Sequence, residues 1–416
     1  MKPGWNVQED QALIPASEQE QAIPEAPPPP AQTPGEWLRT NLFSSPFNTV
    51  LTLVVGALAA WLVFSLLRWA FRVEWTVVRV NTRLFMVGRF PLDEVWRVWV
   101  AVYYVALLSG LTWGWTGRRM RWDPLRVGRR IAAAVLGTLL LLYLVDSPLV
   151  LSLCVGVLAA VVGGTAIGRL SRRGPVGRRV VQVGWLLAFP FVIVVLQAFG
   201  GVGPLHWGGF LLNVLVAVVG IVLSFPIGML LALGRRSSFP AVSAVCVAVI
   251  EFVRGAPLYT WLLFGQFLLP FLLPPGVRMP EIMRAMMMFT LFSSAYVAEI
   301  VRGGLQGVHF GQYEASRALG LSPTRMMAFV ILPQALRNTI PAMISHFISL
   351  FKDTSLLAII GFIELLRVAR VASAAAQFVG TSRQTLLFAA FGFWLVAFSM
   401  SRWSQRLELR LGVGER

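Results

Sequence analysis

Charged residues are scarce in this sequence: they make up 13% of its 416 residues, whereas soluble domains carry about 25%. From Val180 to Gly234 there is no Asp, Glu, Lys or Arg at all. A stretch of this length crosses a bilayer core of about 30 Å twice, at about 20 residues per helix. The apolar runs are continuous rather than alternating, which excludes a membrane β-barrel. The sequence therefore predicts an all-α, polytopic membrane protein.

Cysteine and histidine are also rare, with two Cys and three His residues in the chain. Cys154 and Cys246 lie in apolar runs, where a thiol behaves as a small core side chain. The three His residues lack the spacing of metal ligands. We therefore expect no disulfide framework, no metal site and no cofactor in this chain.

Acidic residues are too few to balance the basic ones, and the formal net charge is +17. The Arg residues gather in short segments between apolar runs, at 117–130, 168–179 and 234–238. Such segments are typical of cytoplasmic loops, because positive charge is retained on that side of the membrane. The pattern therefore predicts membrane topology and argues against nucleic-acid binding.

About ten transmembrane helices are expected. They lie at about 47–67, 98–116, 131–147, 148–168, 180–200, 208–233, 240–272, 285–302, 340–361 and 384–401. The run 240–272 is too long for one straight span at the 1.5 Å rise of a helix. Gly255-Ala256-Pro257 interrupts it, and proline breaks a helix, so we expect one broken span there.

This count predicts that the three Arg-rich segments and both termini lie in the cytoplasm. The segment 72–97 disagrees, because it carries five Arg residues and is placed outside. We expect it to pack on the protein. Residues 1–45 are acidic, rich in Gln and contain four consecutive Pro at 27–30. They predict a disordered cytoplasmic lead-in rather than a secretory signal.

Residues 311–325, "GQYEASRALGLSPTR", are polar in an otherwise apolar chain. Glu314 and Ala315 favour a helix, and Gly320 suits its left-handed end. Ser322 and Pro323 then favour the start of a second helix, expected to reach Pro333. We call this segment the polar hairpin. Helix chemistry alone is equally compatible with an ordinary cytoplasmic connection.

The spacing of the polar hairpin adds information. Glu314, Ala315 and Ser316 are followed after three residues by Gly320, and after nine more by Val330-Ile331-Leu332-Pro333. This resembles the E-A-A, three residues, G, nine residues, I-x-L-P pattern of ABC importer permeases. "AYVAEIVRGGLQ" (295–306), "LPQALRNTIPA" (332–342) and "FKDTSLLAIIG" (351–361) resemble the polar amino acid permeases. Segments before residue 206, such as "RLFMVGRFP" (83–91), resemble the general L-amino acid permease type.

The resemblance implies a type I ABC importer permease core at 206–416, with a cytoplasmic coupling loop at 303–339. Residues 46–205 would form extra N-terminal spans. The residues implied to contact the ATPase are Gln312, Glu314, Ala315, Ser316, Gly320, Leu321, Leu332 and Pro333. Departures from the pattern occur at Gly307, His309 and Phe310, where the family has Ala, Pro and a basic residue.

Charges inside the predicted spans are costly and mark functional candidates. Glu251 and Lys352 each lie eleven residues into their helices, which predicts mid-bilayer positions. With Arg254 and Asp353 they would form either a structural ion network or part of the substrate path. The other path candidates are Ser293, Tyr296, Thr354 and Ser355. Glu299 is expected to pair with Arg302, and Asn213 to bond between helices.

The resemblance predicts a bacterial inner-membrane permease subunit that carries amino acids by ATP-driven alternating access. It is not an enzyme, since no G-x-x-x-x-G-K-[ST] motif is present; ATP and Mg²⁺ would be bound by a partner. Implied partners are two ATPase subunits, a second and related permease chain, a periplasmic amino-acid-binding protein and membrane lipid. The alternatives are an ion-gradient-driven secondary transporter, with the intramembrane charges as coupling sites, and a non-transporting scaffold.

Overall fold

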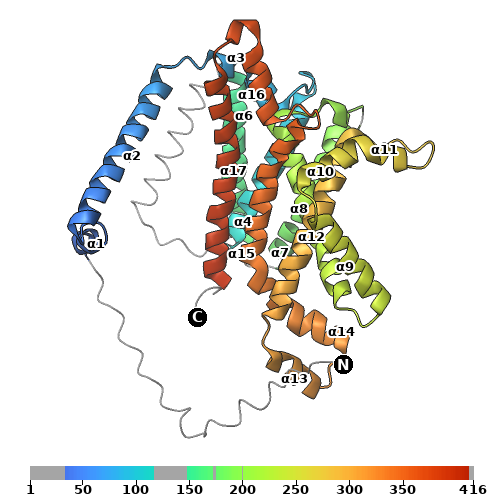
Figure 1. The fold of residues 1–416 in the computed structure, drawn as a ribbon. Coiled ribbons are helices and arrows are strands. Elements are labelled where there is room, and N and C mark those ends of the chain that lie inside the picture. The colour runs from blue at the N-terminus through green and yellow to red at the C-terminus, as the bar shows by residue number, and fades with distance from the viewer. Residues whose placement is uncertain (1–32, 117–147, 172–174, 199, 412–416) are drawn as a thin grey trace. The chain divides into compact units, whose positions relative to one another are not determined.

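The computed structural model of the chain describes residues 33–116, 148–171, 175–198 and 200–411 (Figure 1). These residues form helices, joined by turns and a single isolated bridge between Gly209 and Glu364. The all-α fold class is thereby confirmed. The chain divides into two units, Met1–Val73 and Glu74–Arg416.

The first unit contains α1 (Pro34–Asn41) and α2 (Pro46–Arg72). The side chain of Thr33 caps α1 and Glu36 bonds back to it, a reciprocal arrangement that satisfies free N–H groups at the helix start. This cap explains why residues 34–41 are helical, so the prediction of disorder over 1–45 was wrong there. Helix α2 is an apolar span without a buried residue, as predicted for 47–67.

The second unit contains every later helix. In chain order they are α3 (Thr76–Val87), α4 (Val95–Thr116), α6 (Pro148–Leu170), α7 (Pro175–Gln197), α8 (Gly209–Arg235), α9 (Pro240–Arg254), α10 (Leu258–Leu263), α11 (Leu269–Leu272), α12 (Glu281–Gln306), α13 (Phe310–Ala318), α14 (Pro323–Met326), α15 (Leu332–Asp353), α16 (Leu365–Ala374) and α17 (Ser382–Leu411).

Among the described residues, eight helices are long and apolar enough to cross a membrane, and the bent pair α9 with α10–α11 brings the count to nine. These nine coincide with nine of the ten expected spans. The remaining one, 131–147, lies outside the described residues. The pair bends by 100° between Arg254 and Leu258, as the Gly-Ala-Pro interruption predicts.

Helices α8, α12, α15 and α17 run between two ends of the second unit (Figure 1). Short helices α13 and α14 lie at one end, and α3 and α16 lie at the other. The interior between them is apolar. One buried cluster includes Leu212, Phe289 and Leu350 from α8, α12 and α15. Burial of such side chains is the main force that holds these helices together.

Helix α3 carries two of the five Arg residues of segment 72–97, Arg79 and Arg83. Its apolar face, with Val77, Val78 and Phe85, is buried against Leu365 and Val368 of α16. Its Arg residues occupy the remaining positions. The prediction that this segment packs on the protein is confirmed, because an amphipathic helix can carry charge on one face and bury the other.

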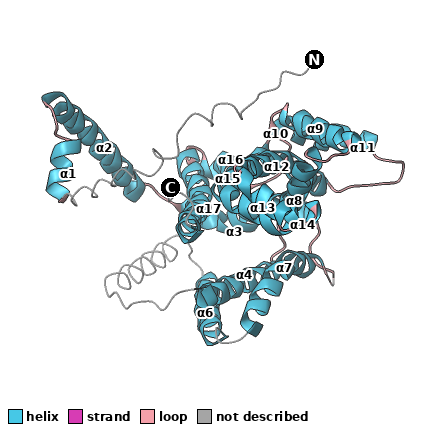
Figure 2. Cartoon of the chain, turned by 90° about the horizontal axis from the view of Figure 1, so that it is seen from below, coloured by secondary structure: helices cyan, strands magenta, loops and turns pink. Residues whose placement is uncertain are grey.

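Helices α4, α6 and α7 form a group beside the core helices (Figure 2). Gly110 of α4 and Gly164 of α6 let their backbones meet: a Cβ at Gly110 would lie 2.3 Å from the Val161 carbonyl oxygen, and one at Gly164 would lie 2.4 Å from that of Leu107. Gly114 and Gly168 repeat the contact one turn further on. Small residues spaced in this way allow close packing of membrane helices.

Candidate functional site

The first half of the polar hairpin is α13, and its ends follow from local chemistry. His309 precedes it, and its Nδ1 accepts a hydrogen bond from the Gly311 N–H at 3.1 Å. Gly320 follows with a φ of +70°, a conformation that glycine adopts without strain. The predicted helix and glycine turn are confirmed. His309 is a helix cap, a role that the sequence comparison alone did not indicate.

The second half begins with α14, and the helical segment does not end at Pro333. It passes through a wider helical turn, η4 (Met327–Ile331), directly into the membrane span α15. The expected end at Pro333 was wrong: proline occupies the first turn of α15, where its missing N–H is tolerated once the turn before it widens. The polar hairpin is therefore continuous with a transmembrane helix.

The inner face of the polar hairpin is buried. Ser316 is 3% exposed and donates a hydrogen bond to the Gln312 carbonyl oxygen. Met326 and Ile331 pack with Leu305 of α12 and Ala232 of α8 in one apolar cluster. This packing fixes the polar hairpin on the ends of two further spans, so displacing it means displacing α8, α12 and α15 or breaking the cluster.

The outer face of the polar hairpin carries Glu314, Ala315 and Gly320, all exposed. Three large apolar side chains of this region are also exposed: Phe310 at the start of α13 by 64%, Leu319 at its end by 79%, and Phe329 in η4 by 76%. Exposed apolar groups next to polar ones are typical of protein interaction surfaces. The motif spacing did not point to Leu319 or Phe329, although both break the polar pattern of a water-facing helix.

The remaining residues predicted for this surface lie at its edges. Gln312 accepts a hydrogen bond from Gln334 of α15 at 3.1 Å. Leu321 and Leu332 are half-buried in the apolar cluster, and Pro333 is exposed. Of the eight predicted residues, Ser316 is buried and the two leucines are half-buried, so these three support the surface from within. The other five are exposed on it.

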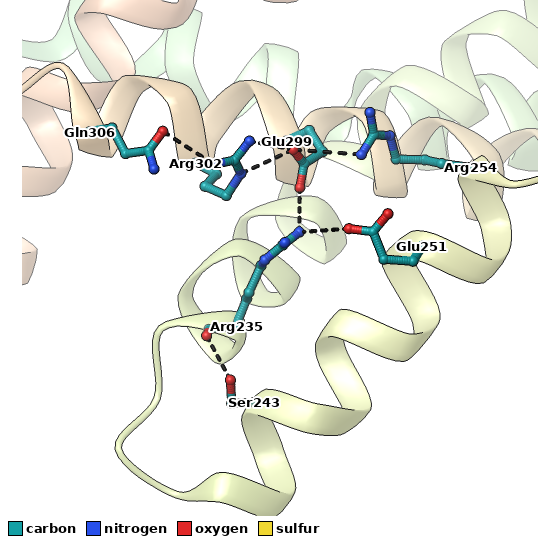
Figure 3. Close-up of polar contacts among 7 residues, drawn as sticks. All are labelled: Arg235, Ser243, Glu251, Arg254, Glu299, Arg302 and Gln306. Carbon is teal, nitrogen blue, oxygen red and sulfur yellow. Dashed lines mark hydrogen bonds and ion pairs between the residues drawn. The ribbon is translucent and has the colours of Figure 1, made fainter. Parts of the chain in front are cut away.

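Five charged side chains from α8, α9 and α12 lie together (Figure 3). We call them the ionic junction: Arg235, Glu251, Arg254, Glu299 and Arg302. Glu299 is central, with its carboxylate 2.6 Å from Arg235 Nη1, 2.8 Å from Arg302 Nη2 and 3.6 Å from Arg254 Nη1. Arg235 also lies 3.2 Å from Glu251. The expected pair of Glu299 with Arg302 is confirmed.

The ionic junction corrects the predicted network of Glu251, Arg254, Lys352 and Asp353. Among the described residues, Lys352 and Asp353 form no ion pair with Glu251 or Arg254. Glu251 instead pairs with Arg235 at the end of α8. Helix α9 runs obliquely to the core helices (Figure 1) and bends sharply after Arg254, so counting residues along α9 does not give the depth of Glu251.

A chain of polar and aromatic contacts continues from the ionic junction into the bundle. Arg254 lies over the ring of Tyr296, 5.7 Å from its centroid. Tyr296 stacks on His346 at 5.6 Å, and His346 Nε2 is 3.0 Å from the hydroxyl of Ser293. Ser293 in turn bonds to Ser224 of α8 at 2.9 Å. Ser293 and Tyr296 were among the predicted path residues. Ser224 and His346 were not, because a single Ser or His in an apolar span does not indicate a site.

The last predicted path residues lie at the other end of α15. Thr354 is buried, and its hydroxyl accepts a hydrogen bond from Asn213 Nδ2 at 3.0 Å. Asn213 also bonds to Glu364, whose carboxylate caps α16. Burial raises the pKa of Glu364, while these hydrogen bonds oppose the shift. The neighbouring Ser355 is half-buried, and Lys352 is exposed. The bond expected of Asn213 is confirmed, and Thr354 is part of it.

Comparison with known proteins defines the class to which this chain belongs. Residues 224–413 match the family described as binding-protein-dependent transport system inner membrane component. The chain is 36% identical over 429 aligned residues to the glutamate/glutamine/aspartate/asparagine transport system permease protein BztC of Rhodobacter capsulatus, which covers 90% of this chain and 93% of that one. The chain therefore belongs to this family.

Two further proteins are similar to this chain. The inner membrane amino-acid ABC transporter permease protein YhdY of Escherichia coli is 36% identical over 395 residues, covering 91% of this chain and 93% of its own. A crystal structure of an amino acid ABC transporter with histidines is 30% identical, covering 49% of this chain and 92% of that one, with a TM-score of 0.44. The family match and the two permease relatives confirm the resemblance to amino acid ABC importer permeases that the polar hairpin indicated. They also support the prediction of a multi-pass inner-membrane protein.

Proposed function

We propose that this chain is the permease subunit through which an ABC importer moves amino acids across the inner membrane. The observation that carries the proposal is the polar hairpin: its outer face is exposed, its inner face is buried on α8 and α12, and its second helix continues into α15. A partner that moves this surface moves three membrane spans with it.

The partner at this surface would be an ATPase subunit that binds ATP and Mg²⁺, since the chain has no phosphate-binding loop of the G-x-x-x-x-G-K-[ST] type. Phe310, Leu319 and Phe329 would enter a cleft on it, with Glu314 and Gly320 at the rim. A second, related permease chain, a periplasmic binding protein and membrane lipid complete the proposed assembly. The polar hairpin, both termini and the Arg-rich loops would then face the cytoplasm, in accord with the charge rule.

The ionic junction gives this movement a second connection. It joins α8, α9 and α12, and its groups are partly hydrated, so ion pairs there can exchange at little cost. The contacts through Tyr296, His346 and Ser293 extend it toward the middle of the bundle. We infer that closure of the ATPase pair shifts the polar hairpin and changes the packing around Ser293 from inward-open to outward-open.

The substrate path would run along the same contacts. Ser293 and Tyr296 lie in their middle, Glu251 and Arg254 at the hairpin end, and Lys352, Asp353, Thr354 and Ser355 where α15 ends. Together they offer both charge signs and several hydroxyl groups, which suits a zwitterionic amino acid. The relative BztC is a glutamate/glutamine/aspartate/asparagine transport system permease protein, which makes these four amino acids the first substrates to test.

Uptake into vesicles tests the proposal. The chain is reconstituted with its second permease and binding protein, either with or without the ATPase, and uptake of labelled L-glutamine and L-glutamate is followed. We expect uptake only with the ATPase and internal ATP. Uptake driven by an ion gradient without the ATPase would favour a secondary transporter, and no uptake in any combination would favour a scaffold.

A further inference from the structure

Arg284 is a buried charge at the start of α12, in the second unit at the end opposite the polar hairpin. Its side chain is 10% exposed. The Nη1 atom donates a hydrogen bond to the Gln266 carbonyl oxygen at 3.0 Å. Gln266 lies in η3 (Phe264–Leu268), a widened helical turn between α10 and α11. The described hydrogen bond of this guanidinium thus goes to a backbone group.

The hydrogen bonding around Arg284 is incomplete. Its Nε is buried and has no hydrogen-bond partner among the described residues, and the same holds for the side-chain oxygen of Gln266. The anion that it contacts, Glu281, is 3.9 Å from Nη2 and its side chain is 53% exposed. A buried cation with a free donor, beside a buried free acceptor, is unfavourable unless something binds there.

Helix α12 and η3 pack closely around this pair. A Cβ at Gly265 would lie 2.5 Å from Met288 Cγ and 3.5 Å from the Arg284 carbonyl oxygen. Widened turns of this kind occur frequently at functional sites. Gln266 lies on η3 and Arg284 on α12, so the packing of these two elements sets where the free acceptor and the free donor lie.

We propose that Arg284 and Gln266 form a subsite for the carboxylate of the transported amino acid as it enters the bundle. A guanidinium binds a carboxylate through parallel N–H···O bonds, and the free Nε is one such donor. The Gln266 oxygen accepts a bond from the substrate ammonium. The inference rests on the proposed function, and it adds an entry subsite at the end of α12 far from Ser293 and Tyr296.

Three variants test the subsite in the purified complex of both permease chains with the ATPase. Arg284→Lys keeps the charge and removes Nε. Gln266→Glu places a carboxylate of the chain itself beside Arg284, which satisfies the guanidinium and occupies the subsite without a loss of folding. Arg278→Gln is the matched control, because it removes an exposed Arg from the segment just before α12.

The measurement is the thermal unfolding midpoint of the complex as L-glutamine is added, since a ligand that binds the folded state raises it. L-glutamine has one carboxylate, and its α-amide, which has none, is the comparison probe. We expect L-glutamine and not the amide to raise the midpoint. Arg284→Lys and Gln266→Glu should raise the half-saturating concentration about tenfold or more, and Arg278→Gln should change it less than about twofold.

Several outcomes overturn the subsite. They are the same half-saturating concentration in all three variants, an equal effect of the amide, and no effect of L-glutamine on the wild-type complex. Loss of the second permease chain from the Arg284→Lys complex, with probe binding unchanged, would overturn the subsite and assign Arg284 to a carboxylate of that chain. Failure of the proposed function is distinct, because the wild-type vesicles would then take up no amino acid.

Discussion

The α4–α6 pair and the ionic junction hold helices together by opposite means. Between α4 and α6, glycines bring backbone against backbone, and no atom can be added without separating the helices. At the ionic junction, long charged side chains span the gap between α8, α9 and α12, and most are partly exposed to water. The first contact has one geometry, whereas the second can rearrange. This difference indicates a rigid N-terminal group and a movable end at the polar hairpin.

The largest effect is expected from Gly164→Leu in the rigid pair. The new side chain would meet the Leu107 carbonyl oxygen, and overpacking of this kind destabilises by about 3 kcal/mol. Gly163→Leu is the control, because nothing lies within 4 Å of a Cβ there. Thermal unfolding of the purified complex should show a large loss for the first variant and little change for the second. Equal midpoints would refute the close packing.

Next in size is Gly320→Asp at the movable end. The variant strains the left-handed turn and adds a charge to the exposed face, so ATP-driven uptake should fall about tenfold or more, while insertion in the membrane is unchanged. Gly320→Asn is the control, because asparagine tolerates this conformation without charge. Normal uptake by Gly320→Asp, measured in the vesicles described above, would count against docking at this surface.

A smaller effect is expected from Glu299→Gln in the ionic junction. Glu299 is the shared partner of three Arg residues, and its loss should destabilise the complex by about 2 kcal/mol. Glu251→Gln removes one exposed partner and should cost less than about 1 kcal/mol. Chemical denaturation measures both. If the two variants are equally stable, Glu299 is not the centre of the junction.

The smallest effect is expected from Asp353→Asn at the end of α15. If this residue lines the substrate path, the relative uptake of L-glutamate and L-glutamine should change by about twofold or more. The change keeps the size of the side chain, and yield is measured in parallel. A lower yield with the same preference would assign Asp353 to packing alone.

The spans and the polar hairpin were predictable because their causes are local. Apolar length defined nine described spans, and the glycine turn at Gly320 follows from one residue. Contacts between helices were not predictable in this way. Glu251 was expected at mid-bilayer because residue number was converted to depth along a straight axis, whereas α9 is oblique. Arg235, Ser224 and His346 have no local signature, since their partners come from other helices.

The same reasoning explains why Arg284 gave no signal. Arg284 directly precedes the predicted span 285–302, and an Arg at such a membrane boundary is usual, because long basic side chains reach the interface. Only the fold shows that η3 covers it and leaves its Nε without a partner. Burial depends on tertiary packing, and a single sequence does not contain that information.

The central claim is that the polar hairpin is the contact for an ATPase. It is tested most directly by a photo-reactive amino acid placed at Ala315, on its exposed face, in the assembled complex. The account predicts covalent coupling to the ATPase subunit, with none from the same group placed at Ala342, which is exposed on α15 within the membrane span. Coupling at Ala342 but not at Ala315, in a complex that transports amino acids, would contradict the account.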